Sequence, residues 1–209
     1  MSMHRPRVAA FDVDGTLTTA DCVVPFLRRT AGTATLVRRL LRTPVPLARA
    51  GLGRDRDALK TAGAAAAFAG LPVAAVDADA AVFAREVFDR RLRHEVISSL
   101  RGHLTDGDTV VLVSASFEIY LRPLAEMLGV HDVIAVRLDV DDDGVLTGRL
   151  DGPNCRGPQK VVRLHDWLGT HAGGRGNVHL TAYGDSTGDR ELLADADVAH
   201  WLGRGEMPG

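Results

Sequence analysis

The stretch that decides the fold is VAAFDVDGTLT, at residues 8–18. Its apolar start, residues 8–11, has the length of a buried strand, although so short a run also fits part of a helix. Residues at i and i+2 of an extended chain point to the same face, so Asp12 and Asp14 would face one small volume where the strand ends. Open α/β sheets bind ligands at such ends. Close carboxylates repel each other, so this pair is expected to hold a proton or to share a cation.

The same residues also have a simpler interpretation. Asp-Val-Asp-Gly is common turn chemistry, because Asp and Gly accept unusual backbone angles. Taken alone, the segment could be a turn with no further role. The choice between the two interpretations depends on what the rest of the chain carries.

Size and composition narrow the class of protein. The chain has 209 residues, 45% of them hydrophobic, and a formal net charge of -2. This length suits one domain, or a core with a smaller insertion. The charge balance gives no reason to expect a nucleic acid partner. Cys22 and Cys155 lack the spacing of a metal or redox site, and no stretch has the length of a signal peptide or a membrane span. A cytoplasmic protein with reduced thiols is therefore expected.

Residues 18–92 are rich in Ala and Arg and predict a small helical bundle without strands. Gly32 and Gly70 stand where helices should stop. Pro44 and Pro46 would break any helix between them. Helices are expected over residues 21–31, 34–42, 55–69 and from Pro72 onward, where apolar residues from 73 to 87 recur at helical steps.

The rest of the chain alternates between strand and helix patterns. Strands are expected at 109–113, 133–136 and 178–183, with a short one near 198, and 138–140 and 145–150 are expected to form a hairpin. Helices are expected at 95–101, after Ser114-Ala115-Ser116 up to Leu128, at 158–169 and at 189–195, with a loop at 171–177. This alternation predicts an α/β fold with a Rossmann-like parallel sheet. The expected division is a core of residues 1–17 and 93–209 and a helical cap of residues 18–92.

Ser114 directly follows the apolar run at 109–113. Its hydroxyl and the next backbone N–H groups, beginning with that of Ala115, could hold an anion at a helix N-terminus. A plain helix cap is the alternative.

Lys160 would lie in the first turn of the helix that begins at Pro158. A cation there opposes the helix dipole, so an anionic partner would explain it, and an exposed lysine is the alternative. Lys60 and Lys160 are the only lysines of the chain. A lysine ammonium is a compact charge that suits a phosphate oxygen, although chance also accounts for so small a number.

The stretch GDSTGD, residues 184–189, adds two carboxylates, Asp185 and Asp189, after the strand at 178–183. Carboxylate oxygens suit Mg²⁺, which takes few protein ligands together with substrate phosphate. An Asp-capped helix start is the alternative. Taken together, four acids, one hydroxyl and one lysine at one edge of a sheet match the requirements of phosphoryl transfer.

These motifs, in this order, resemble the haloacid dehalogenase superfamily, and in particular its phosphoserine-phosphatase-like branch. The matching residues are Asp12 to Thr16, Ser114, Lys160 and 184–189. The resemblance covers almost the whole chain. It implies a Rossmann-like core with an inserted helical cap, an Mg²⁺ cofactor and a small phosphorylated metabolite as substrate.

The resemblance also implies roles for the acids. Asp12 would be the nucleophile that forms an aspartyl-phosphate, which divides one hard displacement into two easier ones. Asp14 would protonate the leaving oxygen and then activate water. Its backbone carbonyl would bind Mg²⁺ together with the carboxylates of Asp12 and Asp185. An acid at position 14 favours phosphate ester cleavage, since dehalogenase members lack it.

The remaining implied roles concern the phosphoryl group. Ser114, Ala115 and Lys160 would bind its oxygens. Asp189 would position Lys160 and the surroundings of the metal.

The chain departs from phosphoserine phosphatases where those enzymes grip the substrate. They carry Asn before the last Asp, where this chain has Gly188. Their cap Glu is matched by the shorter Asp21, and their cap Arg falls near Ala64, with Arg56 and Lys60 nearby. Asp21, Arg56 and Lys60 are therefore the candidate substrate residues, and a substrate other than phosphoserine is expected.

Other functions stay open. A phosphotransferase would use the same intermediate but pass the phosphoryl group to an alcohol. A catalytically silent phosphate-binding regulatory module would have no need of the proton donor Asp14. The arginine-rich stretch of residues 28–60 could touch a membrane surface or a lipid phosphate, although a solvated basic face is the plainer interpretation. The oligomeric state is left open.

Overall fold

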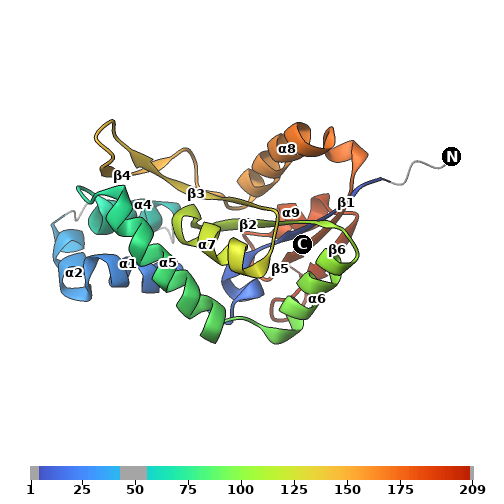
Figure 1. Cartoon of the computed structure of the whole chain (residues 1–209), viewed down its shortest axis with the longest axis horizontal. Coiled ribbons are helices and arrows are strands. Elements are labelled where there is room, and N and C mark those ends of the chain that lie inside the picture. The colour runs from blue at the N-terminus through green and yellow to red at the C-terminus, as the bar shows by residue number, and fades with distance from the viewer. Residues whose placement is uncertain (1–4, 43–55, 208–209) are drawn as a thin grey trace.

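The computed structural model describes residues 5–42 and 56–207, with the side chain of Arg56 also outside the described part (Figure 1). A six-stranded sheet in the order β4-β3-β2-β1-β5-β6 forms the core. Its strands are β1 (Arg7–Phe11), β2 (Thr109–Phe117), β3 (Asp132–Val140), β4 (Leu146–Asp151), β5 (His179–Gly184) and β6 (Val198–Trp201). All pairings are parallel except that of β3 with β4 at the edge. The α/β class expected from the sequence is confirmed.

Strand β1 lies at the centre of this sheet. Ala9 pairs with Val110 of β2 on one side and with Thr181 of β5 on the other. Residues 8–11 are all buried, as expected for a parallel strand covered on both faces. The opening motif therefore leaves the middle of the sheet at its carboxyl end.

Four helices cover the sheet: α6 (His94–Thr105), α7 (Glu118–Leu128), α8 (Pro158–Ala172) and α9 (Arg190–Asp195). In Figure 1, α8 lies on one side of the sheet, and α6 and α7 lie on the other. Gly129 ends α7 and Gly173 ends α8, both in the left-handed conformation that glycine adopts at little cost.

The insertion is helical, as predicted. It contains α1 (Val23–Ala31), α2 (Thr33–Leu41), α4 (Arg56–Phe68) and α5 (Val73–Arg90), which gather beside one end of the sheet (Figure 1). Gly32 and Gly70 have positive φ at the predicted helix ends. The predicted break at Pro44 and Pro46 lies outside the described residues, as does part of the arginine-rich stretch, so contact of this face with a membrane stays a prediction. The exact division into core and cap likewise stays a prediction.

Aromatic rings join the insertion to the core. The ring centroid of Phe26 on α1 lies 4.9 Å from that of Tyr120 on α7, and that of Phe68 on α4 lies 5.3 Å from that of Phe117 on β2. Such edge-to-face contacts add to the free energy gained by burying the rings. The hairpin of β3 and β4 extends this seam, because Gly148 comes so close to α4 that a Cβ there would lie 2.8 Å from the Cβ of Ala69.

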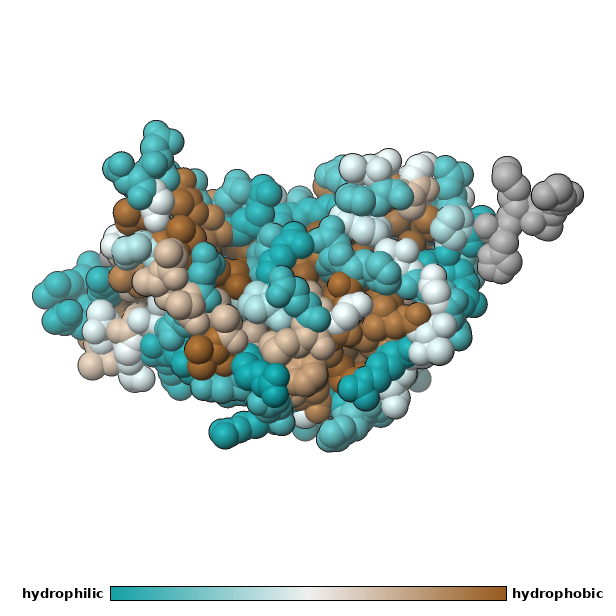
Figure 2. Space-filling view, viewed as in Figure 1, coloured by the Kyte–Doolittle hydropathy of each residue, from teal (hydrophilic) through white to brown (hydrophobic). Residues whose placement is uncertain are grey.

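The face seen in Figure 2 shows apolar residues beside α5, with polar residues around them. A groove of about 380 Å³ runs between α5, α7 and β3, and Val73, Ile119 and Leu138 are among its lining residues. No helix within the described ranges combines the length and the apolar character that crossing a bilayer requires.

Several boundaries differ from the predictions. Strand β2 continues to Phe117 through an irregularity after Val113, so α7 begins at Glu118, and Ser114-Ala115-Ser116 belong to the strand and not to the start of the helix. Strand β3 runs unbroken through residues 132–140, where two separate strands were predicted. The predicted loop at 171–177 instead contains the end of α8 and a short 3₁₀ helix. Strand β2 has no Gly or Pro at its true end, and strand β3 has none between its two predicted parts, so packing sets the bounds of both, whereas Gly173 ends α8.

Candidate active site

A cavity of about 580 Å³ opens at the carboxyl end of the sheet, between β1, β2, the loop after β5 and helices α1 and α4. Its lining includes all the predicted site residues whose side chains are described: Asp12, Asp14, Asp21, Lys60, Ser114, Ala115, Lys160, Asp185 and Asp189. The side chain of Arg56 lies outside the described part. Residues scattered over most of the chain thus meet at one cavity, as the common sheet edge predicted.

The backbone after β1 positions both Asp12 and Asp14 at the cavity. Asp12 and Asp14 have extended ψ angles of 161° and 114°, and Gly15 then turns the chain with a φ of 85°. A Cβ on Gly15 would lie 2.2 Å from Asp185 Oδ2, so only glycine allows this turn to approach the loop after β5. The segment is therefore a turn, as the simpler interpretation held, and the turn also brings two carboxylates to the cavity.

Lys160 is buried and pairs with two carboxylates. Its Nζ lies 2.6 Å from Asp12 Oδ1 and 2.6 Å from Asp189 Oδ1, and the residue is 1% exposed. The alternative of an exposed lysine is therefore wrong. Burial alone would lower the pKa of Lys160, but the two carboxylates outweigh it and hold that pKa above its usual value.

The two carboxylates differ in their surroundings. Burial raises the pKa of Asp12 to about 7, although the attraction of Lys160 opposes this rise. Burial acts in the same direction on Asp189, but Lys160 and the hydrogen bonds from Ser186 outweigh it and lower the pKa of Asp189. The hydroxyl of Ser186 donates to Asp189 Oδ2 over 2.7 Å. The ionised form of Asp189 is therefore stabilised by its surroundings, whereas the ionised form of Asp12 would be stabilised most by a further positive charge nearby.

Three carboxylates could hold a metal ion. Oxygens of Asp12, Asp185 and Asp189 all lie within 4.8 Å of one another. Burial raises the pKa of Asp185, with Asp189 adding to the rise, while Thr16 donates a hydrogen bond of 3.0 Å to its carboxylate. Close, partly buried anionic oxygens are the donor set that Mg²⁺ prefers, so these residues fit such an ion.

The carboxylate of Asp14 lies apart from this cluster. Its Oδ1 accepts a hydrogen bond of 3.0 Å from the Cys22 N–H at the start of the insertion, and its Oδ2 accepts one from the hydroxyl of Ser116 on β2. Burial raises the pKa of Asp14 to about 6. A carboxyl group that titrates near neutral pH can both give and take a proton.

Ser114 is 1% exposed and lies within β2, so its predicted place at a helix N-terminus is wrong, and so is the alternative of a helix cap. Its Oγ accepts a hydrogen bond of 3.1 Å from the Ser116 N–H. This bond leaves the hydroxyl hydrogen of Ser114 to be donated elsewhere. The position still suits anion binding, but without a helix dipole behind it.

The insertion contributes Lys60 and Asp21. Lys60 Nζ donates to the carbonyl oxygen of Ala115 and, over 2.9 Å, to Asn154 Oδ1. Burial lowers the pKa of Lys60 to about 8. Asp21 Oδ1 accepts a hydrogen bond of 3.1 Å from the Val24 N–H, so it caps α1 at the rim of the cavity. This cap explains why α1 starts at residue 23, later than predicted.

Sequence reasoning missed several polar residues at this site. Thr16, Ser116 and Ser186 bind its carboxylates, and Asn154 and Arg156 line the cavity. Their one sequence signal is that each lies close to a predicted site residue along the chain. Serine, threonine and asparagine are common in turns, so that signal is weak.

Comparison with known proteins agrees with this geometry. The model of the haloacid dehalogenase-like hydrolase family matches residues 9–194. Protein CicA of Caulobacter vibrioides is 39% identical over 195 residues, which cover 93% of this chain and 85% of that protein. A protein of unknown function from Bordetella pertussis Tohama I has a solved structure with a TM-score of 0.73 and 28% identity, covering 93% of this chain and 89% of its own.

A structure of the phospho-aspartyl intermediate analogue of phosphoserine phosphatase has a TM-score of 0.60 at 22% identity and covers 93% of this chain and 85% of its own, which shows a shared fold. The match to the family model over residues 9–194 spans both the sheet and the helical insertion. The chain therefore belongs to the haloacid dehalogenase-like hydrolase family.

Proposed function

We propose that this protein is a Mg²⁺-dependent phosphatase that hydrolyses a small phosphomonoester through an aspartyl-phosphate on Asp12. The observation that carries the proposal is the ion pair between Asp12 and buried Lys160, placed beside the carboxylate of Asp185. A nucleophile, a cation for phosphoryl oxygens and a metal site then occupy one cavity. The phosphoserine phosphatase that shares this fold is described with a phospho-aspartyl intermediate analogue, which supports the same intermediate here.

Asp12 and Asp185 would hold the metal with their carboxylates, and Asp14 would hold it with its backbone carbonyl. Bound Mg²⁺ would neutralise negative charge on the phosphoryl oxygens. Asp189 would keep Lys160 in place through their 2.6 Å contact. Its carboxylate is also close enough to the other two to share in holding the ion.

In the first step, a carboxylate oxygen of Asp12 attacks phosphorus and the bond from phosphorus to the ester oxygen breaks. Asp14 gives its proton to that oxygen, so the alcohol leaves uncharged. In the second step, Asp14 takes a proton from water, whose oxygen attacks the aspartyl-phosphate. Inorganic phosphate leaves and the carboxylate of Asp12 is restored.

The residues around phosphorus supply the positioning. The hydroxyl of Ser114, the backbone N–H of Ala115 and the ammonium of Lys160 would donate to the three non-bridging oxygens. In phosphoryl transfer most of the rate enhancement comes from such positioning and charge neutralisation. The hydrogen bonds from Cys22 and Ser116 fix the carboxyl of Asp14 before substrate arrives.

The expected partner is a small phosphorylated metabolite, and a cytoplasmic location fits Cys22 and Cys155, both of which are unpaired and buried. Among the relatives is a histidinol-phosphatase from Neisseria meningitidis, 28% identical over 97 residues, which is 45% of this chain. Together with the phosphoserine phosphatase that shares this fold, it supports phosphate ester cleavage.

The test is a phosphate-release screen with Mg²⁺ over amino acid, sugar, polyol and lipid phosphates, with Asp12→Asn as the blank. Wild-type protein should release phosphate from at least one class, and the variant should be slower by about 10³-fold or more. Denaturing the enzyme during turnover should trap phosphate on wild-type protein only. Product analysis with added alcohols identifies any transfer. A protein that is inactive on every ester, or equally active as Asp12→Asn, would contradict the proposal.

A further inference from the structure

The cavity contains two cations that the proposed reaction does not use. Lys60 reaches it from α4, and Arg156 reaches it from the loop before α8. Both line the same space as Asp14, which would face the leaving alcohol. A role for them would therefore concern the part of the substrate beyond the phosphate that is cleaved.

Lys60 lies next to the phosphate-binding residues. One of its acceptors is the carbonyl oxygen of Ala115, whose own N–H would bind a phosphoryl oxygen, and the other is Asn154 Oδ1. Both acceptors are neutral, and within the described ranges Lys60 forms no ion pair and its third N–H has no hydrogen-bond acceptor. Asn154 is itself fixed by Asp57, to which it donates over 2.5 Å. The carboxylates of Asp14, Asp57 and Asp21 are near enough to favour the charged form of Lys60, although none of them pairs with it directly. Burial outweighs their effect on its pKa, so an anion bound directly to the ammonium would stabilise it further.

Arg156 occupies space that Gly188 leaves open. A Cβ on Gly188 would lie 3.0 Å from Arg156 Nε and 3.1 Å from its Cγ, so a side chain there would push the arginine away. The φ of Gly188 is not positive, so its backbone does not itself require glycine. Arg156 Nη2 donates to Thr187 Oγ1 over 3.3 Å, and no ion pair joins its guanidinium to a carboxylate of the residues that the structure describes.

Lys60 and Arg156 differ from Lys160, another cation that lines the cavity, because Lys160 has carboxylate partners. Lys160 is neutralised by Asp12 and Asp189. Asp21, the acid on the rim, caps α1 through the Val24 N–H. Lys60 and Arg156 thus remain available to an external anion. The ammonium of Lys60 is a compact charge, and the planar guanidinium of Arg156 can donate two parallel hydrogen bonds to a carboxylate or a phosphate.

Building on the proposed phosphatase function, we propose that Lys60 and Arg156 form a second anion subsite. The preferred substrate then carries a second anionic group, a carboxylate or another phosphate, on the alcohol that leaves. Gly188 contributes to this specificity because it lacks a Cβ, which would collide with the side chain of Arg156.

The first experiment measures binding without turnover. Isothermal titration calorimetry at a fixed free Mg²⁺ concentration compares propylphosphonate with 3-phosphonopropionate, 1,3-propylenebisphosphonate and 3-aminopropylphosphonate. At least one of the two ligands with a second anion should bind about 10-fold tighter than propylphosphonate, and the better of the two identifies the group. The proposal would be overturned if all ligands bound with equal affinity, if 3-aminopropylphosphonate bound most tightly, or if neither ligand with a second anionic group bound at all.

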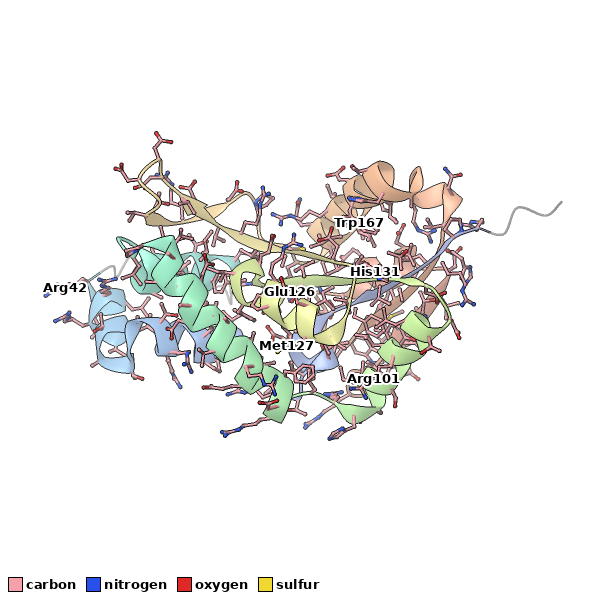
Figure 3. All side chains as sticks on the ribbon, viewed as in Figure 1. Arg42, Arg101, Glu126, Met127, His131 and Trp167 are labelled. Atoms are coloured by element: carbon pink, nitrogen blue, oxygen red, sulfur yellow. The ribbon has the colours of Figure 1, made fainter. Side chains whose placement is uncertain are left out.

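The second experiment tests the named residues. The quantity compared is the affinity for the better ligand with a second anionic group, divided by the affinity for propylphosphonate. Arg156→Met and Lys60→Met should each lower this affinity ratio by about 5-fold or more, and Gly188→Ala should lower it by displacing Arg156. Lys60→Gln, which also removes the charge but keeps a polar group for Asn154, replaces Lys60→Met if the latter fails to fold. Arg101→Met is the matched control, since this exposed arginine lies on α6, away from the cavity (Figure 3). An unchanged ratio in the cavity variants overturns the subsite.

The same ratio separates this proposal from the phosphatase function on which it builds. Turnover of phosphomonoesters with an affinity ratio near one refutes the subsite alone. A high ratio that depends on Arg156, with no ester hydrolysed, refutes the phosphatase and leaves an anion-binding site.

Discussion

Lys160 Nζ lies 2.6 Å from Asp12 Oδ1, although the two residues are 148 positions apart in the chain. The pair ties the start of α8 to the end of the central strand, and both side chains are almost completely buried. A buried ion pair adds little stability compared with an apolar pair, but the loss of one partner leaves a charge without compensation.

We therefore expect Lys160→Met to lower the free energy of unfolding by about 3–5 kcal/mol and to abolish activity. Lys160→Arg keeps the charge but not the compact shape, so it should restore stability only in part. Urea unfolding at neutral pH measures both. A loss below about 1 kcal/mol in the Met variant would mean that Asp12 simply takes up a proton in place of the ion pair.

Asp14→Asn should separate the two chemical steps. It keeps the shape of the side chain but can neither give nor take the proton, so steady-state turnover should fall by about 10²–10⁴-fold. With p-nitrophenyl phosphate the leaving group needs no proton, so the first step is spared and aspartyl-phosphate accumulates. Stopped-flow absorbance should then show a burst of about one nitrophenolate per enzyme. Asp12→Asn is the control and should show no burst; a linear trace in Asp14→Asn would contradict the assigned role.

Removal of the metal ion should show that activity depends on Mg²⁺ bound by the carboxylates of Asp12 and Asp185. EDTA should abolish phosphate release and Mg²⁺ should restore it, and Mg²⁺ should raise the melting temperature, because it binds the folded protein and relieves repulsion. Asp185→Asn should raise the Mg²⁺ concentration needed for half-maximal activity by about 10-fold. Asp142→Asn, on the exposed turn between β3 and β4, should change nothing. Full activity in EDTA would exclude the proposed cofactor.

Phe26 tests how firmly the insertion is held to the core. Its buried ring lies 5.2 Å from the ring of Phe83 and 4.9 Å from that of Tyr120, measured between centroids. Phe26→Ala should cost about 3–5 kcal/mol of stability, through lost burial and the cavity left behind. Val24→Ala, at a position 45% exposed on the same helix, should cost less than about 0.5 kcal/mol in the same denaturation assay. Similar losses in both variants would mean that the ring cluster is unimportant.

Asp132 should make stability depend on acid pH. Its carboxylate accepts hydrogen bonds from the Val133 N–H over 2.7 Å and from Trp167 Nε1 over 2.6 Å, and Arg122 pairs with it over 2.6 Å (Figure 3 shows Trp167). Burial opposes them, but these contacts hold the pKa of Asp132 below its usual value.

A lowered pKa in the folded state means that the unfolded chain takes up the proton first. The stabilisation by Asp132 is therefore present above the unfolded pKa, about 3.9, and is lost as the pH falls through the folded pKa. Asp132→Asn should cost roughly 1–3 kcal/mol at pH 7 and less as the acid limit is approached. Urea titrations followed by Trp167 fluorescence measure this, and an equal loss at pH 7 and pH 3 would contradict it.

Much of the fold could be predicted from local sequence. Gly32, Gly70 and Gly129 end helices where glycine adopts positive φ, and the Val-rich run at 109–113 lies in a buried parallel strand. The end of β2 could not be predicted, because Ser114-Ala115-Ser116 has no strong preference for strand or helix. The pairing of Phe117 with Val136 of β3 keeps these residues extended.

The sequence by itself determined the α/β class, the helical insertion and the meeting of Asp12, Asp14, Lys160 and Asp185 at one edge of a sheet. These follow from periodicity, turn chemistry and the rule that parallel strands end together, all of which act locally. Only the tertiary structure decided which acid pairs with Lys160, that Asp14 is held by the Cys22 N–H and the Ser116 hydroxyl, and that Arg156 lies over Gly188. Those contacts join residues far apart in the chain, and packing and burial of the whole molecule set their distances and shift their pKa values.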